Sequence, residues 1–380
     1  MAVSQGPEFT SDAQMRRSTR WLMGLLLMLM GLGVVMVASA TAPSELAEGK
    51  GYATLIGHVT KVGLSLVALL FGAQLRPRWI EALAAPLWLL SLALLVTVLI
   101  VGPERNNAQR WLDLGSLSVQ PSELARLAVM LAVGAWASRA GTRMSEAVHG
   151  VLVPFVLIGL PAALVLIQPD FGSTVYLLLM GVLVLWTGGA RSQHLLAVFG
   201  ATLALAAIYG LERFEHVARR LRGFMNPEAG GQVEQGLRAL GHGHVLGRGL
   251  GQREVVVPEA ENDFVLAALG EQLGLLGTVG LVALYALFLW HGLRLLMGMR
   301  TRFGLVVGAG LLLQVLVQAV LNIAVVTAVA PPKGLPLPFV SAGGTSLLVL
   351  SLSTGLFLGL ARRPSENPGA TTDAARARSA

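Results

Sequence analysis

The sequence predicts an all-α integral membrane protein, a polytopic bundle of about ten transmembrane helices with one large extracytoplasmic loop between helices 7 and 8. Of its 380 residues, 54% are hydrophobic and only 13% are charged, whereas soluble domains carry about 25% charged residues. The mean hydropathy of the chain is +0.68. The apolar residues also fall in runs long enough to cross a bilayer, which requires about 20 helical residues.

Ten apolar runs define the predicted membrane spans, and polar or proline-rich segments separate them. The runs cover residues 21–41, 53–73, 79–101, 122–138, 149–168, 171–188, 193–211, 264–290, 303–329 and 345–361. The first run lacks a small-residue cleavage site and further spans follow it directly, so we expect it to remain as helix one. We therefore predict a tail at 1–20, a single transmembrane domain at 21–361 that includes the 212–263 loop, and a disordered tail at 362–380.

The positions of the arginines predict that both tails are cytoplasmic. Basic residues recur at every second connection between spans, and the positive-inside rule assigns those connections to the cytoplasm. They are Arg16, Arg17, Arg20, Arg76, Arg78, Arg139, Arg143, Arg191, Arg294, Arg300, Arg302, Arg362 and Arg363. The net charge of +7 then reflects topology and contact with anionic lipid. No nucleic-acid motif accompanies it, so no nucleic-acid partner is expected.

The long loop at 212–263 is basic although it lies on the opposite side. Its arginines are Arg213, Arg219, Arg220, Arg222, Arg238, Arg248 and Arg253. Long translocated segments are largely exempt from the charge rule, so two interpretations remain, a solvated basic loop or a site for an anionic ligand. The chain contains no cysteine, which excludes disulfides and thiol chemistry.

An acidic segment at the entrance to the eighth span is the strongest candidate for chemistry. It reads Pro258-Glu259-Ala260-Glu261-Asn262-Asp263-Phe264. A charge at bilayer depth costs a few kcal/mol, roughly 3 on insertion scales, so such groups usually pair or line a polar cavity. Asp263 is therefore the first candidate. The alternative is that these acids only cap the N-terminus of the helix.

Two other acidic motifs lie on the same side of the membrane. Glu123 and Arg126 are three residues apart, share a helix face and are expected to form a structural ion pair. Asp170 occupies a short turn between spans five and six. It either caps span six or takes part in ligand binding.

Two loops are unusually rich in glycine or proline. Glycines recur from Gly241 to Gly251, and without a preceding strand they indicate tight turns and close backbone approach instead of a phosphate loop. His242 and His244 within this run could hold a metal, but no third ligand has a clear spacing. The segment at 330–346 contains four prolines and three glycines. Such rigid, non-helical backbone is tolerated near a membrane only inside protein or beside water, and we expect it to line the same cavity as Asp263.

Taken together, these motifs resemble the SEDS family of shape, elongation, division and sporulation proteins, and the resemblance covers nearly the whole chain. Six motifs in order carry it. They are Gln109-Arg110-Trp111-Leu112, Gln120-Pro121-Ser122-Glu123, Gln168-Pro169-Asp170, Gly247 with Gly249-Leu250-Gly251, Pro258-Glu259-Ala260 with Asp263-Phe264 and Gly270-Glu271, and Pro338-Phe339 with Ser341 and Gly343-Gly344. Lys333-Gly334 and Pro227-Glu228 are similar to the division branch, FtsW, and Gln109 to Asp113 is closer to the elongation branch, RodA.

The resemblance implies the SEDS fold and a peptidoglycan glycosyltransferase that polymerises lipid II into glycan strands at the outer face of the cytoplasmic (inner) membrane. Such an enzyme serves either cell division or elongation. The implied partners are lipid II, a class B penicillin-binding protein with transpeptidase activity, and other membrane proteins of the divisome or elongasome. Two alternatives remain, a lipid II flippase and a non-catalytic membrane scaffold for the penicillin-binding protein.

The resemblance also implies roles for individual residues. Asp263 matches the essential aspartate of the family and is expected to act as the base or as the ligand of a divalent cation, Mg or Mn. The expected substrate-binding residues are Arg110, Lys333, Arg248, Arg253, Asp170, Ser341, Gly343 and Gly344. Glu123 and Arg126 match an ion pair that tunes activity, and Glu259 and Glu271 support their motifs. The chain departs from the family pattern at Glu261-Asn262, where His-Thr is common, at Gln272 and at Ala342.

Overall fold

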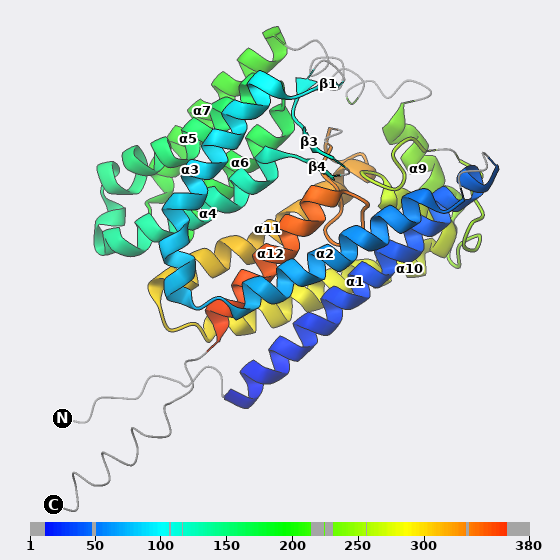
Figure 1. The fold of residues 1–380 in the computed structure, drawn as a ribbon, viewed down its shortest axis with the longest axis horizontal. Helices are drawn as coiled ribbons and strands as arrows, with labels where there is room; N and C mark the ends of the chain where they lie inside the picture. The colour runs from blue at the N-terminus through cyan, green and yellow to red at the C-terminus, as the bar shows by residue number, and fades with distance from the viewer. Residues whose placement is uncertain are drawn as a thin grey trace, which may run out of the picture.

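A computed structural model describes residues 12–47, 51–105, 108–115, 117–213, 224, 231–255, 257–331 and 334–362. Long helices form the body of the molecule (Figure 1). The helices are α1 (Asp12–Ala47), α2 (Ala53–Gln74), α3 (Pro77–Val101), α4 (Pro121–Ala140), α5 (Val153–Ile167), α6 (Phe171–Thr187), α7 (Ser192–Arg213), α9 (Gln232–His242), α10 (Val265–Met297), α11 (Arg302–Val326) and α12 (Gly344–Ala361).

Short elements complete the described chain. Two antiparallel pairs of strands lie between α3 and α4, and single turns of 3-10 and π helix connect α4 to α5. The strands are β1 (Glu104–Arg105), β2 (Ala108–Gln109), β3 (Leu112–Leu114) and β4 (Leu117–Val119), and the turns are η1 (Gly141–Ser145) and η2 (Val148–Leu152).

Each predicted span coincides with a helix, and α1 begins earlier than predicted, at Asp12 inside the expected tail. Eight helices of the described chain are long and apolar enough to cross a membrane. The other two predicted spans are α6, a shorter apolar helix of 17 residues, and α4, which carries Glu123, Arg126 and Arg139. The prediction of a polytopic all-α membrane protein is confirmed.

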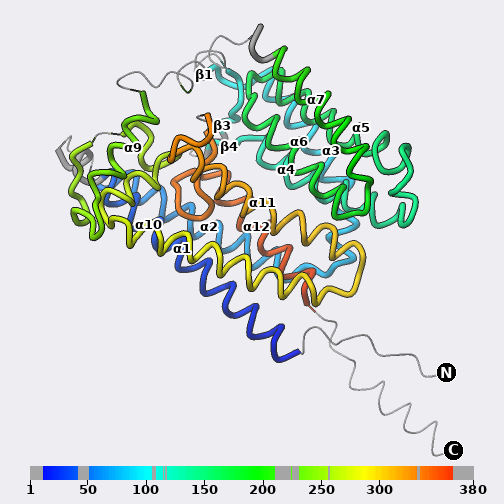
Figure 2. Tube along the Cα trace, turned by 180° about the vertical axis from the view of Figure 1, so that it is seen from behind, coloured from blue at the N-terminus to red at the C-terminus, as the bar shows by residue number. Residues whose placement is uncertain are grey.

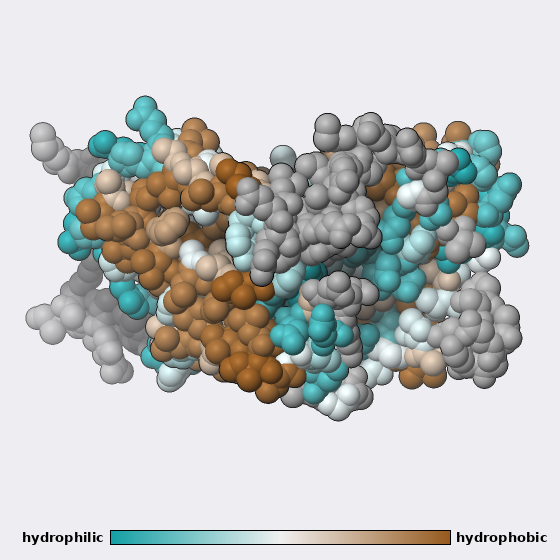
Figure 3. All heavy atoms as spheres, turned by 90° about the horizontal axis from the view of Figure 1, so that it is seen from above, coloured by the Kyte–Doolittle hydropathy of each residue, from teal (hydrophilic) through white to brown (hydrophobic). Residues whose placement is uncertain are grey.

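The burial of the helices explains why α4 tolerates charge. Nearly every residue of α4 is buried, as are most residues of α11 and α12. These helices form the centre of the bundle and contact protein over most of their surface. By contrast, α2, α3 and α7 expose most of their apolar residues. Hydrophobic residues gather in a broad brown region bordered by hydrophilic residues toward both ends of the long axis (Figure 3), as expected for a molecule that crosses a bilayer.

Helices α2 and α12 pack closely along their length (Figures 1 and 2). A β-carbon on Gly355 would collide with the Leu69 carbonyl oxygen, and one on Gly72 would lie 2.9 Å from the Leu352 oxygen. Small residues let membrane helices approach in this way. The start of α1 and the end of α12 lie at the same end of the bundle (Figure 1).

Helix α10 is broken at Gly274, which has φ 65° and ψ −162°. A helix broken at membrane depth must have its freed backbone groups satisfied by protein. The glycine-rich loop provides this, because Leu275 N donates to His244 O at 2.9 Å and Arg248 N donates to Glu271 O at 3.0 Å. A β-carbon on Gly247 would collide with the Gln272 oxygen. The expected close backbone approach of this loop is therefore confirmed.

Candidate functional site

Asp263 lies in a turn that ends one residue before the N-cap of α10, which is Phe264. The turn is closed by Glu259, whose φ is 56° and whose backbone oxygen accepts bonds from Asn262 N and Phe264 N at 3.0 and 3.2 Å. The side chain of Asn262 donates to Glu259 Oε2 at 2.8 Å. Glu259 thus organises the turn, and Asp263 is partly buried at its end.

The proline-rich loop lies against this turn. Ser341 Oγ donates to Asn262 O at 2.6 Å and accepts from Leu337 N at 2.8 Å. Ala342 N donates to Glu261 O at 2.8 Å. A β-carbon on Gly334 would lie 3.3 Å from Asp263 Oδ2, so the carboxylate faces the backbone of this loop. Ser341 therefore holds the two segments together, and the substrate contact that we expected from the sequence stays a prediction.

The structure reveals a second partner of this turn that sequence reasoning missed, namely the amide side chains of α11. Asn322, which is 2% exposed, donates from Nδ2 to both Asp263 O and Leu335 O at 2.8 Å. One turn earlier, Gln318 donates to Pro336 O at 2.8 Å. Gln314, Gln318 and Asn322 are spaced four residues apart and share a face of the helix. This spacing of amides within an apolar span was the signal that could have identified them.

The buried pair of Glu123 and Arg126 lies nearby on α4. Arg126 Nη1 donates to Glu123 Oε1 at 2.8 Å, and the two side chains are 1% and 3% exposed. Arg126 also donates from Nη2 to Ser173 Oγ at 2.7 Å, and its guanidinium lies 4.8 Å from the centre of the Tyr176 ring. The expected pairing is present, and it joins α4 to α6.

Asp170 caps α6, the first of the two roles that the sequence allowed. Its Oδ1 accepts from Ser173 N at 3.0 Å, and its Oδ2 accepts from Gln120 Nε2 at 3.2 Å. Arg110 lies beside it, with Nη1 at 3.9 Å from Asp170 Oδ1. Arg110 also donates to the carbonyl oxygens of Gln168 and Pro169. Its side chain keeps 26% exposure, so it remains accessible to an anion.

The remaining predicted residues lie in the long loop or on the part of α10 that contacts it, and they have protein partners. Glu271 is fully buried, and its Oε1 accepts from the backbone N–H groups of Glu254 and Val255 at 2.7 and 3.0 Å. Arg253 donates to Ala40 O at 2.9 Å. Arg248 pairs with the Glu254 carboxylate. Glu271 and Arg253 therefore hold the loop on α10 and α1, and Arg248 keeps 40% exposure of its side chain.

Metal-binding groups do not converge in the described part of the chain. No cluster of three or more histidine, aspartate or glutamate side chains there could hold an ion. His242 contacts Glu254 at 3.3 Å instead of joining His244 in a ligand set. Among the described residues, Asp263 therefore belongs to no set of three such side chains that could hold a divalent cation.

Several predicted residues lie outside the described residues. They are Lys333, Arg219, Arg220, Arg222, Pro227 and Glu228.

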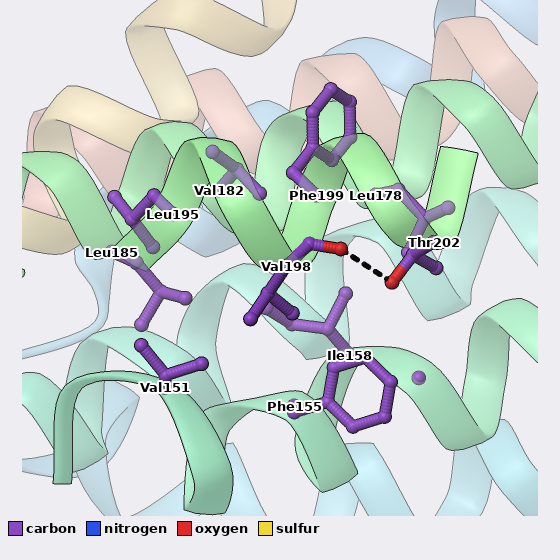
Figure 4. Close-up of a pocket in the computed structure, with 11 residues that line it drawn as sticks. Val151, Phe155, Ile158, Leu178, Val182, Leu185, Leu195, Val198, Phe199 and Thr202 are labelled. Atoms are coloured by element: carbon purple, nitrogen blue, oxygen red, sulfur yellow. Dashed lines mark hydrogen bonds between the residues drawn. The ribbon is translucent and has the colours of Figure 1, made fainter. Parts of the chain in front are cut away.

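A pocket between α5, α6 and α7 is unsuited to polar chemistry (Figure 4). Its walls are almost entirely apolar, with Phe155, Ile158 and Phe199 among them. The hydroxyl of Thr202 donates to Val198 O of its own helix at 2.8 Å. The pocket therefore offers no free donor to a sugar or a phosphate.

Sequence comparison connects the chain to proteins of cell-wall synthesis. The family model for FtsW, RodA and SpoVE, described as cell cycle protein, matches residues 20–366. The probable peptidoglycan glycosyltransferase FtsW of Idiomarina loihiensis is 35% identical over 351 residues, covering 89% of this chain and 86% of the relative. The protein of the same name from Nitrosococcus halophilus is 36% identical over 365 residues, covering 89% and 90%.

Solved structures share the fold. The crystal structure of the rod shape determining protein RodA of Thermus thermophilus matches with a TM-score of 0.69 and 28% identity, covering 91% of this chain and 97% of that chain. A chain of a peptidoglycan synthase complex that coordinates polymerization and crosslinking matches with a TM-score of 0.76 and 28% identity, covering 91% and 98%.

Proposed function

The chain belongs to the FtsW, RodA and SpoVE family, and from that premise we propose that it is a peptidoglycan glycosyltransferase that polymerises lipid II at the outer face of the cytoplasmic membrane. The observation that carries this proposal is the placement of Asp263. Its turn is held on one side by Ser341 and on the other by Asn322, so the backbone of Asp263 has a fixed position and its carboxylate faces the proline-rich loop. Holding a catalytic group in a fixed position lowers the barrier for a reaction between two bound substrates.

The proposed reaction joins two lipid II molecules. A sugar hydroxyl of the acceptor attacks the anomeric carbon of the donor, whose bond to the diphosphate breaks, and the hydroxyl proton passes to a base. Asp263 takes this proton or holds a divalent cation that assists. The departing diphosphate needs positive charge. Arg110 and Arg248 are partly exposed and suit this role, and Lys333 and Arg253 are further candidates.

Partner and topology belong to the same proposal. A class B penicillin-binding protein would crosslink the strands, which the similarity to a chain of a peptidoglycan synthase complex supports. Both termini would be cytoplasmic, in agreement with the arginine distribution. The FtsW relatives favour a role in division.

Polymerisation from purified components tests the proposed activity. The full chain, copurified with a partner whose transpeptidase serine has been replaced, is expected to convert lipid II into a ladder of glycan strands. A scaffold would yield strands only when the partner or another enzyme supplies the active site. A flippase would move fluorescent lipid II across vesicles without forming strands. Either of the last two results would refute the proposed activity.

Asn322→Leu is expected to slow strand synthesis by about 10- to 100-fold through kcat, with a smaller effect on KM. The substitution removes two buried hydrogen bonds that position Asp263 and Leu335, and small displacements of a catalytic group carry penalties of about this size. Gln314→Leu is the matched control, because the Gln314 side-chain amide is buried with no hydrogen-bond partner among the described residues. Equal activity of the two variants, measured at equal thermal stability, would contradict the positioning role.

A further inference from the structure

Lys61, a charged residue within the membrane helix α2, lies over the beginning of α12. A β-carbon on Gly344 would lie 3.0 Å from Lys61 Cδ, 3.1 Å from Cε and 3.5 Å from Nζ. The side chain therefore runs along Gly344 and brings its ammonium group to the first residue of α12. The missing side chain of Gly344 provides the room.

The N-terminus of α12 has no capping side chain; its N-cap is Gly343. The first N–H groups of a helix have no partner within it, and no described residue accepts a bond from the N–H of Gly344, Thr345 or Ser346. The hydroxyls nearby are engaged elsewhere, because Thr345 donates to Ser118 O at 3.0 Å and Ser346 accepts from Gln318 at 3.2 Å. The positive end of α12 is therefore open.

The Lys61 ammonium and the N-terminus of α12 are thus two positive groups that lie beside each other. The helix dipole places about half a positive charge at its N-terminus, and an ammonium beside it is repelled unless an anion lies between them. No carboxylate among the described residues forms an ion pair with Lys61. The Glu123 carboxylate contacts the Ser346 hydroxyl in this turn, but it is already paired with Arg126. A counter-charge for Lys61 must therefore come from outside the described protein.

Polar atoms without partners continue along the same face of α2. His58, 1% exposed, has no hydrogen-bond partner at either ring nitrogen, and the Ser65 hydroxyl has none in the described chain. Positions 58, 61 and 65 share a helix face, the one that packs on α12 (Figures 1 and 2). Burying a polar group without a hydrogen-bond partner is costly, so this face indicates a polar ligand beside Lys61.

We infer that Lys61 and the open N-terminus of α12 bind a phosphate group, and specifically the diphosphate of a polyprenyl-linked substrate. An ammonium together with free N–H groups at a helix start is the donor set that phosphate oxygens require. Gly343 and Gly344 open the helix next to the Ser341 bond that holds the Asp263 turn. The inference rests on the proposed function, because that reaction supplies a lipid diphosphate.

Direct binding of undecaprenyl diphosphate to the full chain in nanodiscs tests the site without requiring polymerisation. Lys61→Met is expected to weaken binding about tenfold or more, and Lys61→Arg to retain most of it. Gly344→Ala is expected to weaken binding as well, although it removes no charge, because its methyl group displaces the Lys61 side chain. Arg78→Met, at an exposed arginine in the first turn of α3, is the charge-matched control and should bind as the wild type does.

The competing outcomes are distinct. Unchanged affinity in Lys61→Met and Gly344→Ala would overturn the inference. The inference would also be overturned if these variants lost affinity for phosphatidylglycerol vesicles or inorganic diphosphate but kept their affinity for undecaprenyl diphosphate. The site would then bind another anion. Failure of the proposed function would appear differently, as intact diphosphate binding by a wild-type chain that makes no strands. The melting temperature of each variant establishes that it is folded.

Discussion

Asp263→Asn and Asp263→Ala are expected to lower strand synthesis from lipid II by about 10²- to 10⁴-fold, the range that a general base contributes. The fold should persist, because Asn322 holds Asp263 by its backbone oxygen and not by its carboxylate. Glu261→Gln is the matched control from the same turn. Its bond to Ala342 also uses the backbone, so this variant should keep wild-type activity and stability.

The same assay separates the two roles of Asp263. If the carboxylate is a base, chelators leave wild-type activity unchanged. If it holds a divalent cation, a chelator abolishes activity and added Mg²⁺ or Mn²⁺ restores it. Strand synthesis that survives in both Asp263 variants would remove Asp263 from the chemistry altogether, and the aspartate would then be a feature of the turn.

Arg126→Met is expected to destabilise the protein by about 3–5 kcal/mol, because it leaves the Glu123 carboxylate buried without its partner. It also removes the bond to Ser173 and the contact with Tyr176. The double variant Glu123→Gln, Arg126→Met should be more stable than the single variant, since no unpaired charge remains. Resistance to unfolding by heat and by SDS measures both.

An exposed pair provides the control for this effect. Arg139 and Glu81 lie 3.6 Å apart with side chains 68% and 36% exposed. Pairs of this kind contribute about 0–1 kcal/mol, so Arg139→Met should unfold almost as the wild type does. A similar loss in Arg126→Met and Arg139→Met would show that the burial of the Glu123–Arg126 pair does not determine its contribution.

Hydropathy was sufficient to locate the spans, because a membrane allows few alternatives. Backbone groups in lipid must be satisfied internally, so long apolar runs become helices, and each of the ten runs did. The exception is the break in α10 at Gly274. Nothing in the run itself distinguishes that glycine from Gly270 or Gly277, since the break depends on a loop that supplies hydrogen bonds from outside the helix.

The sequence also predicted side-chain interactions correctly where the two partners are close in sequence. Glu123 and Arg126 are one helix turn apart, and their pairing follows from helix geometry. Asp170 is different, because a helix cap and a ligand-binding site would both place an aspartate in this turn, so the sequence does not distinguish the two roles. The structure shows the cap, and it adds a bond from Gln120, 50 residues away, to the second carboxylate oxygen; a ligand-binding role stays a prediction.

The sequence by itself therefore determined the membrane fold and the family resemblance, and it predicted Asp263 as the candidate among three neighbouring carboxylates. Only the tertiary structure decided what surrounds that aspartate. Asn322 is 59 residues from Asp263, and Ser341 is 79 residues from Asn262. Lys61 likewise meets Gly344 only because α2 and α12 pack together. Such contacts depend on which helices pack together. The spacing of residues along one helix does not show which distant residue it will contact.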